Sequence, residues 1–187
     1  MMRILVVYGT RQGHTAHLAA RIADGLRAAG HDVEVRDLHE SWPFPIGFDA
    51  IVVGASVHAR GFEKEDISWA TQSADDLLRL PNAFFSVSLT AANHDQKSKA
   101  ELDAIIHDFV THTGWRPQHI AEFAGELAYS KYNWLLKRVM RWIAKRESGG
   151  QYQDMSHDYD LTDYEAVDAF TKQLAENLTT TKPVSPT

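Results

Sequence analysis

The chain has 187 residues, of which 44% are hydrophobic and 24% are charged, and it contains no cysteine. This composition is typical of about one folded domain and excludes a disordered or collagen-like chain. Disulfides, zinc–thiolate sites, iron–sulfur clusters and thiol redox chemistry are excluded as well, so any redox function needs a bound organic cofactor. The net charge of −6 argues against nucleic acid as a partner.

The N-terminus leads directly into the apolar run 4–7, without the apolar region of a signal peptide. No stretch approaches the roughly 20 apolar residues that a membrane-spanning helix needs. We therefore expect a cytoplasmic protein.

Short apolar runs rich in β-branched residues alternate with segments whose apolar residues recur every three or four positions. The first pattern predicts strands at 3–8, 31–36, 49–54, 82–89 and 119–127. The second predicts helices at about 18–29, 63–79, 100–112, 131–146 and 163–177.

This alternation predicts an α/β fold, a three-layer sandwich in which helices cover both faces of a parallel sheet. For five strands we expect the flavodoxin-like order 2-1-3-4-5. Residues 1–178 form one predicted domain, with an insertion at about 128–160 that carries a basic helical segment before the last helix. The tail 179–187 is expected to be flexible.

In such a sheet, a ligand binds beyond the carboxyl ends of the strands, near the switch in strand order. The loop after the first strand leads into a helix and contains Thr10, Arg11, Gln12, Gly13, His14 and Thr15. Backbone N–H groups at a helix N-terminus, hydroxyl groups and a guanidinium suit a phosphate monoester. We expect the phosphate of flavin mononucleotide (FMN) here, because the loop lacks the motifs of nucleotide triphosphatases and dinucleotide folds. A polar helix cap without a ligand is the alternative.

The loops after the third and fourth strands are small and polar. The predicted cofactor-binding residues there are Ser56, Val57, His58, Ala59 and Arg60, followed by Ser88, Leu89, Thr90, Ala91, Ala92 and Asn93. A phospho-receiver domain would need an aspartate where Gly54-Ala55-Ser56 stands, which largely excludes that class. Each loop alone could be a solvated turn, but together they favour a planar ring bound at this edge.

Neither loop contains an aromatic residue before Phe62, which leaves one face of a bound ring open to a flat substrate unless an aromatic residue of the insertion covers it. This favours an enzyme over a pure electron shuttle. We predict no catalytic acid or base, because no Ser-His-Asp set or carboxylate pair stands out and a flavin itself carries hydride chemistry. The ten histidines lack a metal-ligand pattern and are expected at the surface.

Residues 131–146 contain six basic residues and no acid, which leaves a net charge of −12 for the rest of the chain. The apolar residues of this segment fall on one helical face. Two interpretations stay open: a helix packed on the domain, or a helix lying on an anionic membrane surface.

Several motifs together resemble one known family, the flavodoxin-like, menaquinone-dependent protoporphyrinogen IX dehydrogenases. These motifs are Thr10-Arg11-x-Gly13-x-Thr15, Gly54-Ala55-Ser56, Phe85-Ser86-Val87-x-Leu89, Trp115-Arg116-Pro117, Gly125-x-Leu127-x-Tyr129-x-x-Tyr132-x-Trp134, Ser148-Gly149-Gly150 and Thr162-Asp163-Tyr164. The resemblance implies FMN as cofactor, oxidation of protoporphyrinogen IX, a tetrapyrrole in heme biosynthesis, and a membrane quinone as electron acceptor. A quinone dissolved in the bilayer gives a reason for the second interpretation of residues 131–146, which would place the protein peripherally on the inner face of the cell membrane. Two alternatives stay open: a flavodoxin-like NAD(P)H:quinone reductase, and a non-enzymatic flavodoxin electron carrier.

Overall fold

The structure is a computed structural model that describes residues 1–58, 61–93, 95–127 and 159–180. Several sequence predictions fall outside these residues: Ala59 and Arg60 of the second loop, the basic helix 131–146, and the tail from residue 181 onward.

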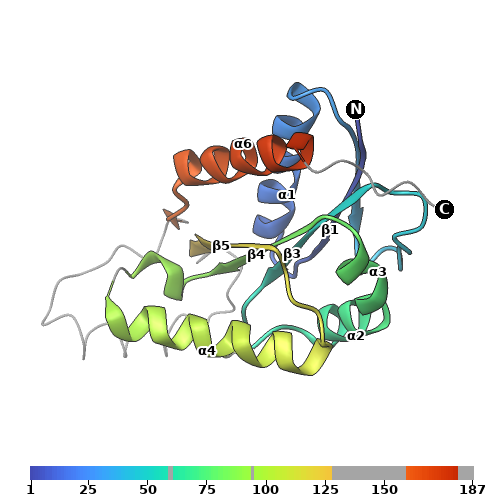
Figure 1. Ribbon diagram of the computed structural model, residues 1–187. Coiled ribbons are helices and arrows are strands. Elements are labelled where there is room, and N and C mark those ends of the chain that lie inside the picture. The colour runs from blue at the N-terminus through green and yellow to red at the C-terminus, as the bar shows by residue number, and fades with distance from the viewer. Residues whose placement is uncertain (59–60, 94, 128–158, 181–187) are drawn as a thin grey trace, which may run out of the picture.

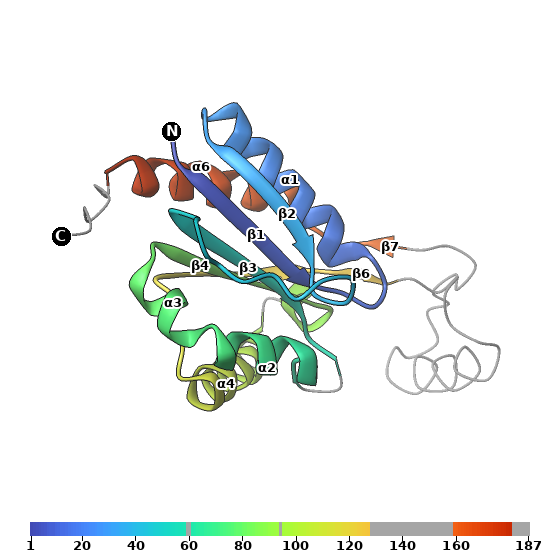
Figure 2. The ribbon, with the colours of Figure 1, turned by 90° about the vertical axis from the view of Figure 1, so that its right-hand side faces the viewer.

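A five-stranded parallel sheet forms the middle layer, with the strand order β2-β1-β3-β4-β5. The strands are β1 (Arg3–Gly9), β2 (Asp32–Asp37), β3 (Ala50–Ser56), β4 (Asn82–Ser88) and β5 (His119–Ala124). Every residue of β3 and β4 is buried, as expected for central strands covered on both faces. The predicted flavodoxin-like fold and strand order are therefore confirmed (Figure 2).

Helices form the two outer layers (Figure 1). One face of the sheet carries α1 (His14–Ala28) and α6 (Tyr164–Thr180). The opposite face carries α2 (Lys64–Gln72), α3 (Ala74–Arg79) and α4 (Gln96–Thr113), and a single 3₁₀ turn, η1 (Thr90–Ala92), precedes α4. This layering brings the loops after β1, β3 and β4 to one edge of the sheet.

Two predicted elements are divided in the structure. The helix predicted at 63–79 ends at Ser73, whose φ of −97° and ψ of 4° separate α2 from α3. The strand predicted at 119–127 ends at Ala124, and the Gly125 N–H makes one more hydrogen bond to β4, to the Ser88 carbonyl. The short strand β6 (Glu126–Leu127) then pairs antiparallel with β7 (Tyr159–Asp160).

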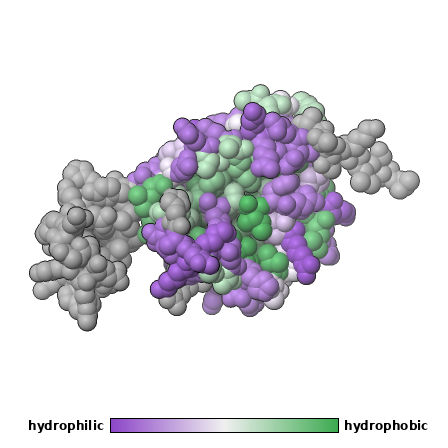
Figure 3. Space-filling view, turned by 60° about the vertical axis from the view of Figure 1, so that its left-hand side comes forward, coloured by the Kyte–Doolittle hydropathy of each residue, from purple (hydrophilic) through white to green (hydrophobic). Residues whose placement is uncertain are grey.

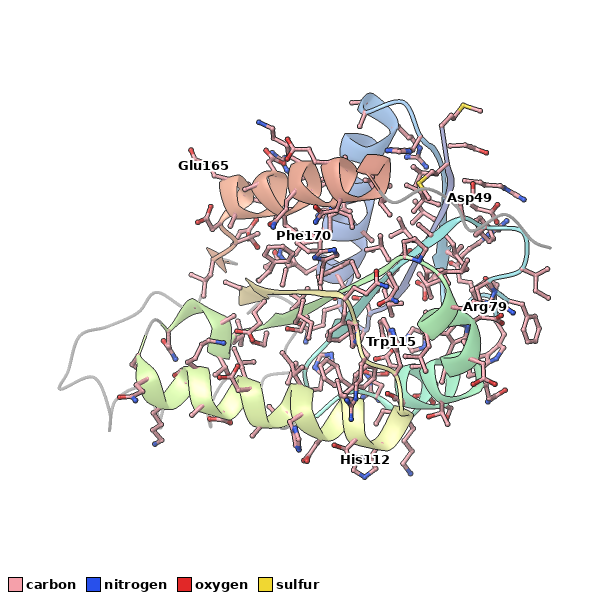
Figure 4. All side chains as sticks on the ribbon, viewed as in Figure 1. Asp49, Arg79, His112, Trp115, Glu165 and Phe170 are labelled. Atoms are coloured by element: carbon pink, nitrogen blue, oxygen red, sulfur yellow. The ribbon has the colours of Figure 1, made fainter. Side chains whose placement is uncertain are left out.

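Each face of the sheet has its own hydrophobic core. The core under α1 and α6 includes Leu18, Ile22 and Phe85, and Phe170 packs against it. The core under α2, α3 and α4 includes Trp69 and Trp115, both fully buried. Figure 4 shows Phe170 and Trp115 pointing inward, whereas the labelled charged side chains lie at the periphery. A fully buried side chain of this size contributes roughly 1.5–3 kcal/mol to stability, so the two cores fix the sheet between its helices.

One buried polar side chain, Asn82 at the start of β4, has all its hydrogen-bonding groups paired. Its amide nitrogen donates to the carbonyls of Leu77 and Leu80, at 2.6 and 2.9 Å. Its amide oxygen accepts from the Trp115 indole N–H and the Gln118 backbone N–H, both at 3.1 Å. Asn82 therefore joins the end of α3, the start of β4 and the chain that leads into β5.

Candidate functional site

The loop between β1 and α1 turns sharply at Gly13. Gly13 precedes the helix with a φ of 93°, a left-handed conformation that side-chain-bearing residues rarely adopt. Its N–H donates to the Thr10 hydroxyl at 3.0 Å. Among the described residues, no side chain caps α1 and no acidic residue lies in its first turn. The helix N-terminus therefore presents its partial positive charge to the loop, as a phosphate group requires.

The three predicted loops meet at one small cavity of about 90 Å³. It is lined by Thr10, Gln12, His14, Thr15, Ser56, Val57, His58, Val87, Ser88, Leu89, Gly125 and Glu126. Ligand pockets usually measure about 300–1,000 Å³, so this cavity suits one part of a ligand, such as a phosphate group, rather than a whole cofactor. The position and chemistry of its lining fit the predicted phosphate-bearing ligand.

Some of the predicted site residues lie elsewhere. The Arg11 guanidinium forms an ion pair with Glu63. Ala91, Ala92 and Asn93 line a second cavity of about 490 Å³, between η1, α4, β5 and the start of α6. Thr90, the first residue of η1, lines neither cavity. The structure thus brings the first half of the third loop to the predicted site, and the second half faces the neighbouring cavity.

His14 connects the phosphate loop to the segment that follows β7. Its Nε2 lies 2.7 Å from the Thr162 hydroxyl, which itself donates to the Ala124 carbonyl at 2.9 Å. Because the single hydroxyl proton of Thr162 is used there, Nε2 of His14 is the donor to Thr162. The side chain of Asp160 approaches the same ring nitrogen to 3.7 Å. His14 is only 8% exposed, so the expectation of a surface histidine is wrong at this position.

Asp160 and Tyr164 extend this network. The Tyr164 hydroxyl donates to Asp160 at 2.5 Å, and this hydrogen bond is the main cause that raises the pKa of Tyr164 to about 12. Burial acts to raise the pKa of Asp160, but hydrogen bonds from Tyr164 and Thr162 outweigh burial and hold it below its usual value. Asp160 is therefore a carboxylate at neutral pH and holds the base of α6 beside the site.

A pair of buried carboxyl groups, which did not stand out in the sequence, lies beside the phosphate loop. Glu63 is the residue that precedes α2, Asp66 lies in the first turn of that helix, and the two are 8% and 3% exposed. An Oδ atom of Asp66 lies against the end of β1, where a Cβ on Gly9 would come within 1.8 Å of it. Neither Oδ atom makes a hydrogen bond of normal geometry to the residues that the structure describes. The Glu63 backbone N–H nevertheless lies close enough to oppose part of the rise in the pKa of Asp66.

The surroundings of this pair change its acidity. Burial, followed by the nearby Glu63 carboxylate, raises the pKa of Asp66 to about 7. Burial also lowers the pKa of His58, although the Glu63 carboxylate opposes this shift. His58 is therefore largely neutral at pH 7, and its Nε2 lies 2.9 Å from the Ser56 hydroxyl on the cavity wall.

The sequence alone did not reveal the carboxyl pair or the Asp160–Thr162 network. Glu63 and Asp66 are three residues apart and so share one helical face, but this spacing is common on solvated helices. Asp160 and Thr162 are about 150 residues from His14 along the chain, and no local pattern connects them. Within the described ranges, no group of three or more His, Asp or Glu side chains could hold a metal ion.

The surface around the second cavity is mixed in polarity. Figure 3 views the molecule from the side where α4 and α6 begin, with hydrophobic residues lying between hydrophilic ones. Leu161, which lines the second cavity, is 44% exposed. Of the helices that the structure describes, none has the length and apolar character to cross a bilayer.

Known proteins similar to this chain include two named protoporphyrinogen IX dehydrogenase [quinone]. The protein of that name from Escherichia coli strain K12 is 29% identical over 175 residues, which cover 93% of this chain and 95% of the relative. The one from Leishmania major is 30% identical over 177 residues, which cover 92% of this chain and 74% of the relative. The similarity extends over nearly the whole chain, as the motif resemblance implied.

Solved structures of flavodoxins share the fold. A flavodoxin from the domain Archaea superposes with a TM-score of 0.53 at 15% identity, over 95% of this chain and 99% of its own. Oxidised flavodoxin 1 from Bacillus cereus gives a TM-score of 0.53 at 14% identity, over 96% and 99%. The flavodoxin domain family matches residues 5–154. By fold, by the loops at the carboxyl edge of its sheet and by this match, the chain belongs to the flavodoxin domain family, whose domain implies a bound flavin.

Proposed function

We propose that this protein is an FMN-dependent oxidoreductase that oxidises protoporphyrinogen IX to protoporphyrin IX and passes the electrons to a membrane quinone. The observation that carries the proposal is the similarity, over 92–93% of the chain, to relatives named for this activity. A phosphate-sized cavity at the helix N-terminus, formed by the three expected loops, supports the cofactor.

In this proposal, the first loop holds the FMN phosphate. The Thr10 and Thr15 hydroxyls and the N-terminus of α1 would donate to phosphate oxygens. The lining formed by Ser56, Val57, Ser88 and Leu89 would lie against the remainder of the cofactor. The described cavity lining contains no Phe, Tyr or Trp that would stack on the ring. FMN, when bound, supplies the hydride and electron transfer chemistry.

The cofactor assignment is tested by binding. The purified protein should release FMN, and not FAD, on denaturation. Gly13→Asp should abolish FMN binding, because it adds a negative charge and a side chain at a left-handed position. Gly30→Asp, at another left-handed glycine, beyond the far end of α1, is the matched control and should retain binding. Undiminished FMN affinity in the Gly13 variant contradicts the assignment.

The substrate is tested by anaerobic mixing of the oxidised holoprotein with protoporphyrinogen IX, and separately with NAD(P)H. We expect protoporphyrinogen IX to reduce the flavin and a menaquinone analogue to reoxidise it. Rapid reduction by NAD(P)H without reduction by protoporphyrinogen IX would instead identify an NAD(P)H:quinone reductase. A flavin that neither donor reduces would favour an electron carrier.

The proposed membrane contact rests on sequence alone, since the basic segment 131–146 lies outside the described residues. Binding to anionic vesicles should weaken steeply as salt increases. Replacement of Arg138 and Arg141 by Glu should reduce vesicle binding while FMN content stays unchanged. A wild-type protein that ignores anionic vesicles at low salt would show that this segment meets the substrate, a partner or the domain itself.

A further inference from the structure

The buried carboxyl pair Glu63–Asp66 has no role in the proposed oxidation, yet it lies beside the proposed cofactor site. Two acidic side chains less than a tenth exposed, one with no normal hydrogen bond to either oxygen, are unusual in a folded protein. The negative charge of Glu63 adds to the effect of burial in making ionisation of Asp66 unfavourable. The arrangement therefore favours a state in which the two carboxyl groups together hold one proton.

Three loops place titratable or charged side chains next to Glu63. The protonation of the pair therefore depends on the charges in these loops. The Arg11 guanidinium, from the phosphate loop, pairs with Glu63. The Nε2 atoms of His39 and His58, from the loops after β2 and β3, each lie 3.8 Å from a Glu63 carboxylate oxygen. On α2 itself, Glu65 also acts on Asp66. Arg11 is 68% exposed, which leaves this cation free to reorient.

We propose that Glu63 and Asp66 take up one proton from solvent when a phosphate group occupies the Thr10–Thr15 loop, and that Arg11 transmits the charge of the phosphate to the pair. A phosphate dianion beside Arg11 competes with Glu63 for the guanidinium. Whether Arg11 turns or stays, negative charge is added near two acids, and this favours their protonated form. The proton forms one O–H bond within the pair. This inference rests on the proposed function only in assuming a cofactor that bears a phosphate group.

A linked proton makes the affinity for FMN depend on pH. Because binding takes up a proton, the dissociation constant rises as pH rises, by up to about tenfold per pH unit for one proton. This dependence grows as pH rises through about 7, the pKa of Asp66, because the free protein progressively loses this proton there. The phosphate of FMN is already a dianion there, since its second pKa is about 6. Its own titration therefore does not mask the effect.

Calorimetric titration of the full chain with FMN at pH 7.5, in two buffers of different ionisation enthalpy, counts the protons. We expect uptake of a large fraction of one proton per FMN, since Asp66 is already partly protonated at this pH, and none with riboflavin, which lacks the phosphate. Glu63→Gln and Asp66→Asn should each abolish the uptake. Asp75→Asn, which removes an exposed carboxylate on α3, is the matched control and should keep it.

The outcomes separate this inference from the proposed function. FMN binding without proton uptake, or uptake that survives in both Glu63→Gln and Asp66→Asn, overturns the inference and leaves the cofactor assignment standing. Equal uptake with riboflavin overturns the role of the phosphate. Complete failure to bind FMN contradicts the proposed function and the inference together. If Glu63→Gln does not fold, Asp66→Asn decides alone, because Asn has nearly the shape of the carboxyl group but cannot take up the proton.

Discussion

Two buried polar clusters lie at opposite ends of the strands of the same sheet, and they differ in how many of their polar atoms form hydrogen bonds. Asn82, at the amino end of β4, pairs both groups of its amide through four hydrogen bonds and carries no charge. Asp66, near the carboxyl end of β1, is equally buried but lacks normal hydrogen bonds to its carboxylate. A buried amide whose hydrogen bonds are all made therefore holds the surrounding backbone in place. A buried carboxyl group without such hydrogen bonds instead gains or loses its proton as the charges around it change.

The strongest change should appear in the pH dependence of stability, tested with Asp66→Asn. The pKa of Asp66 is raised from 3.8 to about 7 in the folded protein. Between these values the unfolded chain releases the proton while the folded protein keeps it, so wild-type stability falls as pH rises from about 4 to 7. This rise in the pKa corresponds to at most about 4 kcal/mol of unfolding free energy. The unfolding free energy of Asp66→Asn should not fall over this pH range.

Urea unfolding of both proteins at pH 5, 6, 7 and 8 measures this difference. Asp75→Asn serves as control and should follow the wild-type curve, because Asp75 is exposed. Parallel curves for wild type and Asp66→Asn would show that Asp66 titrates normally in the folded protein.

The second-largest effect is a loss of stability expected when the hydrogen bonds of Asn82 are removed. Asn82→Ala removes four hydrogen bonds and leaves the buried indole N–H of Trp115 without its partner. We expect a loss of about 3 kcal/mol at any pH between 5 and 8, since no titratable group is involved. The melting temperature should fall by roughly 6–12 °C.

Gln118→Ala is the control for Asn82→Ala, because it removes only the side-chain acceptor of the Asn82 backbone N–H, at 3.3 Å. This variant should cost under about 1 kcal/mol. If Asn82→Ala costs no more than Gln118→Ala, the Asn82 hydrogen bonds contribute little to stability.

A third prediction locates the carboxyl group of Asp66. Gly9→Ala would place a Cβ 1.8 Å from its Oδ1 atom. Displacing this buried side chain should cost about 1–3 kcal/mol of unfolding free energy. In an Asp66→Ala background the same Gly9→Ala change should cost almost nothing, because the obstacle is gone. Equal costs in both backgrounds would place Asp66 away from β1.

The weakest effect is expected for Arg11→Gln, which removes the cation paired with Glu63. Because Arg11 is mostly exposed, and because His39, His58 or a proton can compensate Glu63, the loss of stability should stay within about 1 kcal/mol. Thermal unfolding at pH 7 measures it, and Arg79→Gln, from another exposed ion pair, is the control. A loss of about 3–5 kcal/mol would instead be typical of a broken buried ion pair and would make Arg11 a fixed part of the scaffold.

The five strands of the parallel sheet, their order and the edge at which the loops of the site meet could be predicted from the amino-acid sequence. The central strands are continuous apolar runs, which have one stable place in a sheet covered on both faces. The glycine and threonines of the first loop precede an apolar helix pattern, so their position at a helix N-terminus followed from local chemistry. Thr10, Thr15, Ser56 and Ser88 accordingly line one cavity.

Which polar side chains became buried, and which partners they met, depended on the packing of the layers. Glu63 and Asp66 belong to a helix whose sequence does not show which face is covered, and burial follows from the contact between α2 and the end of β1. The contact of His14 with Thr162 joins residues 148 positions apart. Hydrophobic periodicity is local and can be recognised in the sequence. The pairing of polar groups depends instead on contacts between distant segments that exist only in the folded protein.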